Sequence, residues 1–191
     1  MPRNQFQRMI FALITVVITV HAYVFYSLYV VNGNFFMQLT GFRSVLESIR
    51  AMGGVELLGR RVPIWTVVLV EFCFAYTLEC VMGSPASFRL ACKSFNPRET
   101  HPVIFETAVI CATVALMCPS MSLIAAFLYY PYSEVPFNVL TFLAGWLKLV
   151  CFNFPFAFFT QLFFIQPFVR TAFKLIFAKD IARRAAEQAE Q

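Results

Sequence analysis

Long apolar segments separated by shorter polar ones dominate the chain. Apolar residues run almost continuously over about 9–31, 62–82, 103–130 and 139–166, and most charged residues lie between or beyond these segments. A bilayer core about 30 Å thick needs roughly 20 apolar residues of helix to cross it, and each segment is long enough. The pattern predicts an all-α integral membrane protein in which four spanning helices form a bundle.

The segments between the predicted spans differ in character. The first connection carries apolar residues at helical spacing, which predicts either a short helix at the membrane interface or a polar connector. These residues are Phe42, Val45, Leu46 and Ile49, and they precede Gly53 and Gly54. Residues 86–102 are polar and basic, and residues 169–191 are charged and helix-prone. We expect the latter segment to be a cytoplasmic helical tail.

Two segments of the chain align with each other without a gap. Residues 71–85, EFCFAYTLECVMGSP, match residues 153–167, NFPFAFFTQLFFIQP, at two phenylalanines, an alanine and the final proline. In this alignment Glu71 stands against Asn153, and Glu79 stands against Gln161. The two segments therefore share a pattern but differ in their ionisable groups.

We interpret the chain as two two-helix units that precede the tail. The first unit covers residues 1–85 and the second covers residues 86–168. Because two spans return the chain to the side on which it started, the units are predicted to be parallel repeats.

Composition and charge agree with a membrane location. Of the 191 residues, 60% are hydrophobic and 13% are charged, whereas a soluble domain has about a quarter charged residues. The net charge of +5 arises from basic residues that flank the spans, so we expect no nucleic-acid partner. Ten Lys and Arg residues lie on the side of the termini and four on the other side, which predicts cytoplasmic N- and C-termini. The first apolar run is too long for a cleaved signal peptide.

Ionisable side chains inside the spans are the first candidates for function, because a charge at the bilayer centre costs about 2.5–3.5 kcal/mol. His21 and Glu71 lie at similar distances from the cytoplasmic ends of their spans, so we expect them at one level near the midplane. This pair can exchange a proton or bind a cation, or it can form a fixed hydrogen bond between the two spans. Lys148 can reach inward to Glu71 or extend to the outer interface.

Polar residues of the second unit extend the candidate site. Asn153 and Gln161 lie eight residues apart, with Ala157 halfway between them, so all three share one face of the last span. Such a face suits either a helix interface or a polar pathway. Ser122 in the third span is a further candidate for lining the path.

Two prolines inside the predicted spans are expected to bend their helices. Pro119 and Pro155 each lack the backbone N–H of a helical hydrogen bond. Prolines are common in membrane helices, so we interpret both residues as structural.

No pattern typical of an enzyme is present in the sequence. It lacks the GxSxG, HExxH and phosphate-loop motifs. The six cysteines form no CxxC pair and no Cys/His set with metal-ligand spacing. We expect no catalytic activity, no cofactor and no metal site.

The motifs PRN (2–4), NPR (96–98), CPSMS (118–122) and NFPFAFF (153–159) resemble those of a bacterial family of small membrane proteins. It is a domain-of-unknown-function family built from a repeated two-helix unit. The resemblance covers nearly the whole chain, apart from the first loop and the tail. It implies four spans in the bacterial cytoplasmic (inner) membrane, and it implies no particular activity.

The architecture is also similar to that of proton-coupled antimicrobial-compound efflux proteins, which duplicate a two-helix unit. That family has an essential acid in its first span. In this chain the first span holds His21 and the acid is Glu71 in the second span. The resemblance therefore implies no role for an individual residue here.

Two functions of different classes fit these observations. The first is a small transporter, working as a homo-oligomer in the lipid bilayer, that moves an unknown amphipathic or cationic small molecule against protons. The second is a non-transporting membrane interaction or scaffold protein. The transport hypothesis predicts that His21, Glu71, Asn153 and Gln161 converge on one wet cavity, whereas a scaffold places them at separate dry helix contacts.

Overall fold

A computed structural model describes residues 5–31, 44–133 and 135–178 of the chain. The motif at residues 2–4, the predicted helix start at Phe42 and the tail beyond residue 178 lie outside these residues. Among the described residues, four helical segments are long and apolar enough to cross a membrane: Gln5–Val31, Ile64–Gly83, Pro102–Leu128 and Val139–Ile176. The prediction of an all-α, four-span membrane protein is confirmed at this level.

The first two spans each end in a π-helical turn. The first span is helix α1 (Gln5–Phe25) followed by η1 (Tyr26–Val31). The second is α4 (Ile64–Leu78) followed by η2 (Glu79–Gly83). π-helical turns are rare and often occur at functional sites.

The remaining spans are α6 (Pro102–Leu128) and α7 (Val139–Thr160). Helix α7 continues through the π-helical turn η3 (Gln161–Ile165) into α8 (Gln166–Ile176). The fourth helical segment is thus longer than the predicted span at 139–166. The helix continues past Pro167 and past residue 169, where the tail was expected to begin.

Residues 86–102, for which the sequence predicted only a polar and basic segment, are partly helical. Helix α5 (Ser84–Ser94) follows η2 directly, with Pro85 in its first turn. Its ring contact between Phe88 and Phe105, 5.6 Å between centroids, joins it to the start of α6. Residues 95–101 form the irregular connection between the end of α5 and the start of α6.

The first connection contains both a short helix and a hairpin. Helix α3 (Val45–Ala51) confirms the helical alternative for this connection. Strands β1 (Val55–Leu57) and β2 (Arg60–Val62), which the sequence did not predict, pair antiparallel. Leu58 and Gly59 have φ values of 51° and 74°, as a two-residue hairpin turn requires. The Leu58 N–H donates to the Leu128 carbonyl at 2.8 Å, which fixes the hairpin to the end of α6.

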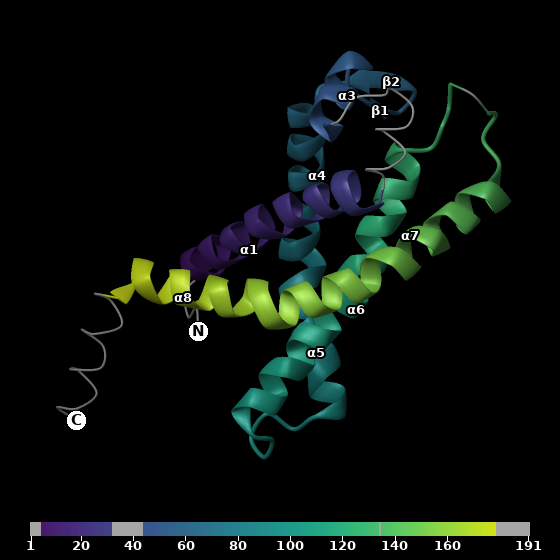
Figure 1. Cartoon of the computed structure of the whole chain (residues 1–191). Helices are drawn as coiled ribbons and strands as arrows, with labels where there is room; N and C mark the ends of the chain where they lie inside the picture. The colour runs from purple at the N-terminus through teal and green to yellow at the C-terminus, as the bar shows by residue number, and fades with distance from the viewer. Residues whose placement is uncertain (1–4, 32–43, 134, 179–191) are drawn as a thin grey trace.

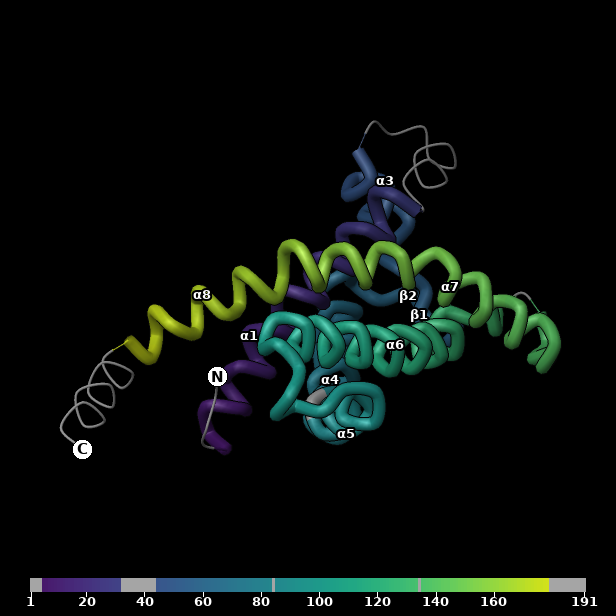
Figure 2. The backbone as a smooth tube through the Cα atoms, turned by 90° about the horizontal axis from the view of Figure 1, so that it is seen from below, coloured from purple at the N-terminus to yellow at the C-terminus, as the bar shows by residue number. Residues whose placement is uncertain are grey.

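The four spans cross rather than run side by side. In Figure 1, α4 and α6 run steeply through the view, and α1 and α7 cross them obliquely. The main packing partners are α6 with α7, α5 with α6, and α1 with α4. Figure 2 shows α5 close to the lower side of α6 and α7 on its other side.

Two small apolar cores hold the crossed pairs together. Between α1 and α4, Ala75 packs against Val16 and Val20, which are 3% and 4% exposed. Between α6 and α7, Ala157 packs against Val114 and Cys118. In each core, a small residue lets the neighbouring helix approach closely, as is common between membrane helices.

Both prolines predicted as bend sites lie inside continuous helices. Pro119 is within α6 and Pro155 is within α7. The Pro119 carbonyl accepts a hydrogen bond of 3.0 Å from the Trp146 indole N–H of α7. This bond joins the two helices at the level of the proline.

Candidate functional site

A large cavity lies among the four spans. Its volume is about 1540 Å³, and α1, α4, α6 and α7 line it together with residues of α5 and α8. Most lining side chains are apolar, with carboxylates, amides, hydroxyls and basic groups placed along it. The volume exceeds the roughly 300–1,000 Å³ of sites for drug-sized ligands, so the cavity has room for a long amphipathic molecule.

Glu71 enters this cavity from α4 and is bonded to a residue of the other unit. The Tyr129 hydroxyl donates to the Glu71 carboxylate at 2.5 Å. Tyr129 caps the end of α6, where its backbone N–H donates to the Ala125 carbonyl. The carboxylate is therefore oriented by a phenol at the end of the neighbouring helix α6. A carboxylic acid in such a partly apolar space is a natural group for carrying a proton.

Asn153 occupies the position in α7 that aligns with Glu71. Its side-chain N–H donates to the Ser122 hydroxyl of α6 at 3.4 Å. Asn153, Ala157 and Gln161 all line the cavity, as expected from their spacing on one helical face.

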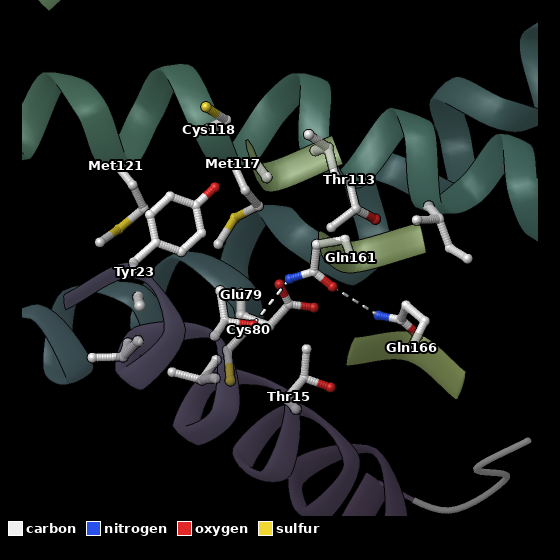
Figure 3. A pocket seen from close by; sticks show the side chains of 18 of the residues that line it. Thr15, Tyr23, Glu79, Cys80, Thr113, Met117, Cys118, Met121, Gln161 and Gln166 are labelled. Atoms are coloured by element: carbon white, nitrogen blue, oxygen red, sulfur yellow. Dashed lines mark hydrogen bonds between the residues drawn. The ribbon is translucent and has the colours of Figure 1, made fainter. Parts of the chain in front are cut away.

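Gln161 begins the π-helical turn η3 and connects two units. Its side-chain N–H donates to the Thr19 hydroxyl of α1 at 2.9 Å. Its carbonyl oxygen accepts from the Gln166 side chain at 3.5 Å. Figure 3 shows Gln161, Glu79 and Thr113 facing the same space, with Thr15 on the opposite wall.

Glu79 begins the corresponding turn η2, and its carboxylate lies against the backbone of Gly83. A Cβ added at Gly83 would stand 2.4 Å from the Glu79 Oε2 atom. Glycine thus provides the space that this carboxylate occupies. Glu79 also lines the cavity, so the first unit contributes two carboxylates to the site.

Lys148 and His21 differ in their placement. Lys148 of α7 lines the cavity and its side chain is exposed. His21 does not line the cavity; it is exposed on α1, and its Nδ1 lies 2.7 Å from the Val17 carbonyl of its own helix. The predicted pairing of His21 with Glu71 is not what the structure shows, because the bonded partner of Glu71 is Tyr129.

Several residues of the site were not identified from the sequence. Tyr129 begins the run Tyr129-Tyr130-Pro131-Tyr132, which is typical of an interfacial aromatic belt followed by a turn rather than of a site. Thr19 could not be recognised as a site residue from the sequence, because threonine hydroxyls in apolar helices usually donate to a backbone carbonyl of their own helix. Arg170 forms an ion pair with Glu106 across α8 and α6, and both line the cavity. A carboxylate near the start of a long apolar helix was the available signal for Glu106.

The part of the chain that the structure describes holds no group of three His, Cys, Asp or Glu side chains suited to a metal ion. The polar groups of the cavity are carboxylates, amides, hydroxyls and the basic groups of Lys and Arg. These groups bind polar parts of a ligand and take up or release protons.

Comparison with known families identifies part of the chain. Residues 103–177, from α6 through α8, match the model of a domain of unknown function (DUF2798). The resemblance to such a family is confirmed over these residues and not over nearly the whole chain. They cover both spans of the second predicted unit and the first part of the expected tail. No curated protein and no solved structure was found to match the chain. The similarity to efflux proteins stays a prediction.

Proposed function

We propose that this membrane protein transports an amphipathic or cationic small molecule through the cavity, coupled to proton movement. The observation that carries the proposal is the convergence of Glu71, Asn153 and Gln161 on one cavity, which Lys148 and Ser122 also line. They come from three different spans and the turn η3. His21, which the transport hypothesis also placed there, does not line it. Polar groups inside spans are costly and mark pathways of ions or solutes in membrane proteins.

Glu71 is the proposed proton-carrying group. In its ionised form it accepts the hydrogen bond from Tyr129, and in its protonated form it is neutral in an apolar surrounding. A cationic solute favours the ionised form, whereas its release favours the protonated form. The solute and the proton would then compete for one carboxylate, which is the simplest basis for exchange. Glu79 is proposed as a second contact for the solute.

The proposed orientation has both termini in the cytoplasm of a bacterial inner membrane. The excess of basic residues on that side supports it. We also propose a homo-oligomer, because a second copy would shield the polar groups of the cavity from lipid.

A scaffold role is the second candidate, and two hydrogen bonds favour it. The contacts Asn153 to Ser122 and Gln161 to Thr19 join neighbouring helices. Such bonds stabilise helix association in membranes whether or not a solute passes. In this role the polar residues hold the helices in place and nothing crosses.

Solute-induced proton movement distinguishes the two candidates. Inverted vesicles that contain the protein receive a pH gradient, and cationic and anionic amphiphiles are then added one at a time. We expect at least one amphiphile to release protons in vesicles with the wild-type protein, and Glu71→Gln to abolish this response. Glu47→Gln is the matched control, because Glu47 is exposed on α3 and does not line the cavity. No response across the panel, or an unchanged response in the folded Glu71→Gln variant, would contradict the proposal.

A further inference from the structure

Four basic side chains gather at one end of the cavity. They come from three helices that are far apart in the sequence and have no role in the proposed proton exchange. All four line the cavity: Arg8, Arg89, Arg170 and Lys174.

Three contacts bring these helices to the same end. The Phe11 and Phe173 rings meet edge to face with centroids 5.7 Å apart, which places α1 near Arg8 beside α8 near Lys174. The Phe88–Phe105 ring contact joins α5, next to Arg89, to the first turns of α6. The ion pair between Arg170 and Glu106 joins α8 to the same turns of α6.

The charge at this end is positive even when the carboxylates are counted. Glu106 faces the cavity and is paired with Arg170, and Glu79 lines it from the turn that leads into α5. Four cations and two carboxylates leave a balance of +2. The space above them is lined mostly by apolar side chains.

We propose that this end of the cavity binds the headgroup of an anionic glycerophospholipid, whose acyl chains lie along the apolar lining between the spans. Basic pockets between spanning helices bind anionic headgroups, and each Lys or Arg contributes to the attraction. The cavity volume of about 1540 Å³ suits a ligand larger than a soluble metabolite. This inference does not rest on transport, because it concerns binding at the end of the cavity remote from Tyr129.

Basic residues also flank spans for reasons of orientation alone, and the chain offers a control for that effect. Lys93 lies on α5 one turn after Arg89, and Arg98 follows that helix. Both are exposed and neither lines the cavity. Substituting them removes the same charge from the same side without altering the cavity.

The test is a thermal unfolding titration of the full chain in detergent with phosphatidylglycerol, and with phosphatidylcholine of the same acyl chains. A ligand that binds the folded state raises its stability in proportion to the logarithm of concentration over Kd. We expect stabilisation by phosphatidylglycerol and little by phosphatidylcholine. The double variant Arg8→Gln/Arg89→Gln is expected to bind phosphatidylglycerol about 30-fold more weakly, and Lys93→Gln/Arg98→Gln to bind it as the wild type does.

Three outcomes would overturn the proposal. Equal weakening by both double variants would show general attraction to the surface. Equal stabilisation by both lipids would show that the site does not distinguish an anionic from a zwitterionic headgroup. Stabilisation by glycerol 3-phosphate at the same concentration would show a site for a free anion. Arg8→Lys/Arg89→Lys keeps the charge, so recovery of binding in this variant separates the loss of a contact from a loss of folding.

Discussion

The second half of each predicted unit can be compared residue by residue, and the two segments agree in backbone but not in chemistry. The π-helical turns begin at Glu79 and at Gln161, 82 residues apart (from 79 to 161), and the helices that follow, α5 and α8, begin and end with the same offset. Yet the carboxylates of the first segment are amides in the second. The same π-helical turn forms with a carboxylate at its first position in η2 and with an amide in η3. The backbone geometry of the turn therefore does not require a carboxylate.

The two segments pack in the same way, but their polar side chains have different hydrogen-bond partners. Ala75 and Ala157 each pack on two residues of the preceding span that are four apart. Glu71, however, takes its hydrogen bond from Tyr129 of α6, whereas Asn153 donates its own to Ser122 of the same helix. The packing of the two segments is alike, and their polar partners are not. We infer that the second segment maintains the cavity wall and the first adds ionisable groups to it.

Moving the carboxylate from the first segment to the second is the strongest test of whether the two positions differ in function. In Glu71→Asn/Asn153→Glu, the carboxylate stands beside Ser122 and no longer meets Tyr129. We expect solute-induced proton movement in vesicles to fall to background, because the acid has lost its phenol partner. Glu71→Asp, which keeps an acid one methylene shorter, is the control and should retain part of the activity. Wild-type activity in the exchanged variant would mean that the two positions are equivalent.

Glu79→Gln makes the turn η2 chemically similar to η3. A hydrogen bond to a charged group contributes about 1.5–3 kcal/mol, so we expect the apparent affinity for a cationic solute to fall about tenfold or more. The proton movement at saturating solute should change much less. A titration of proton movement against solute concentration separates the two quantities. An unchanged half-saturation concentration would exclude Glu79 as a solute contact.

Gly83→Ala moves the Glu79 carboxylate without changing any charge. The new methyl group would overlap the carboxylate at 2.4 Å, and the flexible side chain must swing away. We expect a smaller loss of apparent affinity than in Glu79→Gln. Gly145→Ala in α7 is the matched control, because a Cβ at Gly145 meets nothing within 4 Å, and it should gain stability by about 0.5–1 kcal/mol. Equal transport titrations for both variants would contradict the account of Glu79.

Thr19→Val tests the contact that joins η3 to the first unit. Valine removes the hydroxyl acceptor of the Gln161 side chain and keeps the shape of the residue. Hydrogen bonds between membrane helices contribute about 0.6 kcal/mol on average, so the expected loss of unfolding free energy is small. Thr77→Val is the control, because the Thr77 hydroxyl donates to the Cys73 carbonyl of its own helix. A thermal unfolding comparison in detergent should show a lower midpoint for Thr19→Val than for Thr77→Val.

The number and rough positions of the spans could be predicted from the sequence because membrane length constrains apolar segments strongly. The pattern also placed Asn153 and Gln161 on one face of a helix, since the helical period is fixed. Helix α5 was missed because it lies outside the apolar runs and its polarity resembles that of a loop. The hairpin after α3 was missed because three-residue strands give almost no periodic signal.

The partner of Glu71 could not be predicted for a different reason. The sequence places residues at depths along each helix but not around it relative to other helices. His21 matched Glu71 in depth and yet faces away from the cavity. Tyr129 belongs to the end of another helix, and the oblique crossing of the spans brings it to Glu71. Crossing angles depend on many side chains together.

The central claim is that the cavity among the spans is wet, and thiol labelling in native-like vesicles tests it most directly. Thr113 of α6 lines the cavity, whereas Cys111, two residues earlier, does not. The two positions differ in depth by about 3 Å. A charged, water-soluble thiol reagent should therefore modify the Thr113→Cys variant at the new thiol and leave Cys111 unmodified, as read by peptide mass spectrometry. Absence of labelling at both positions, or equal labelling of both, would contradict a water-filled path through the protein.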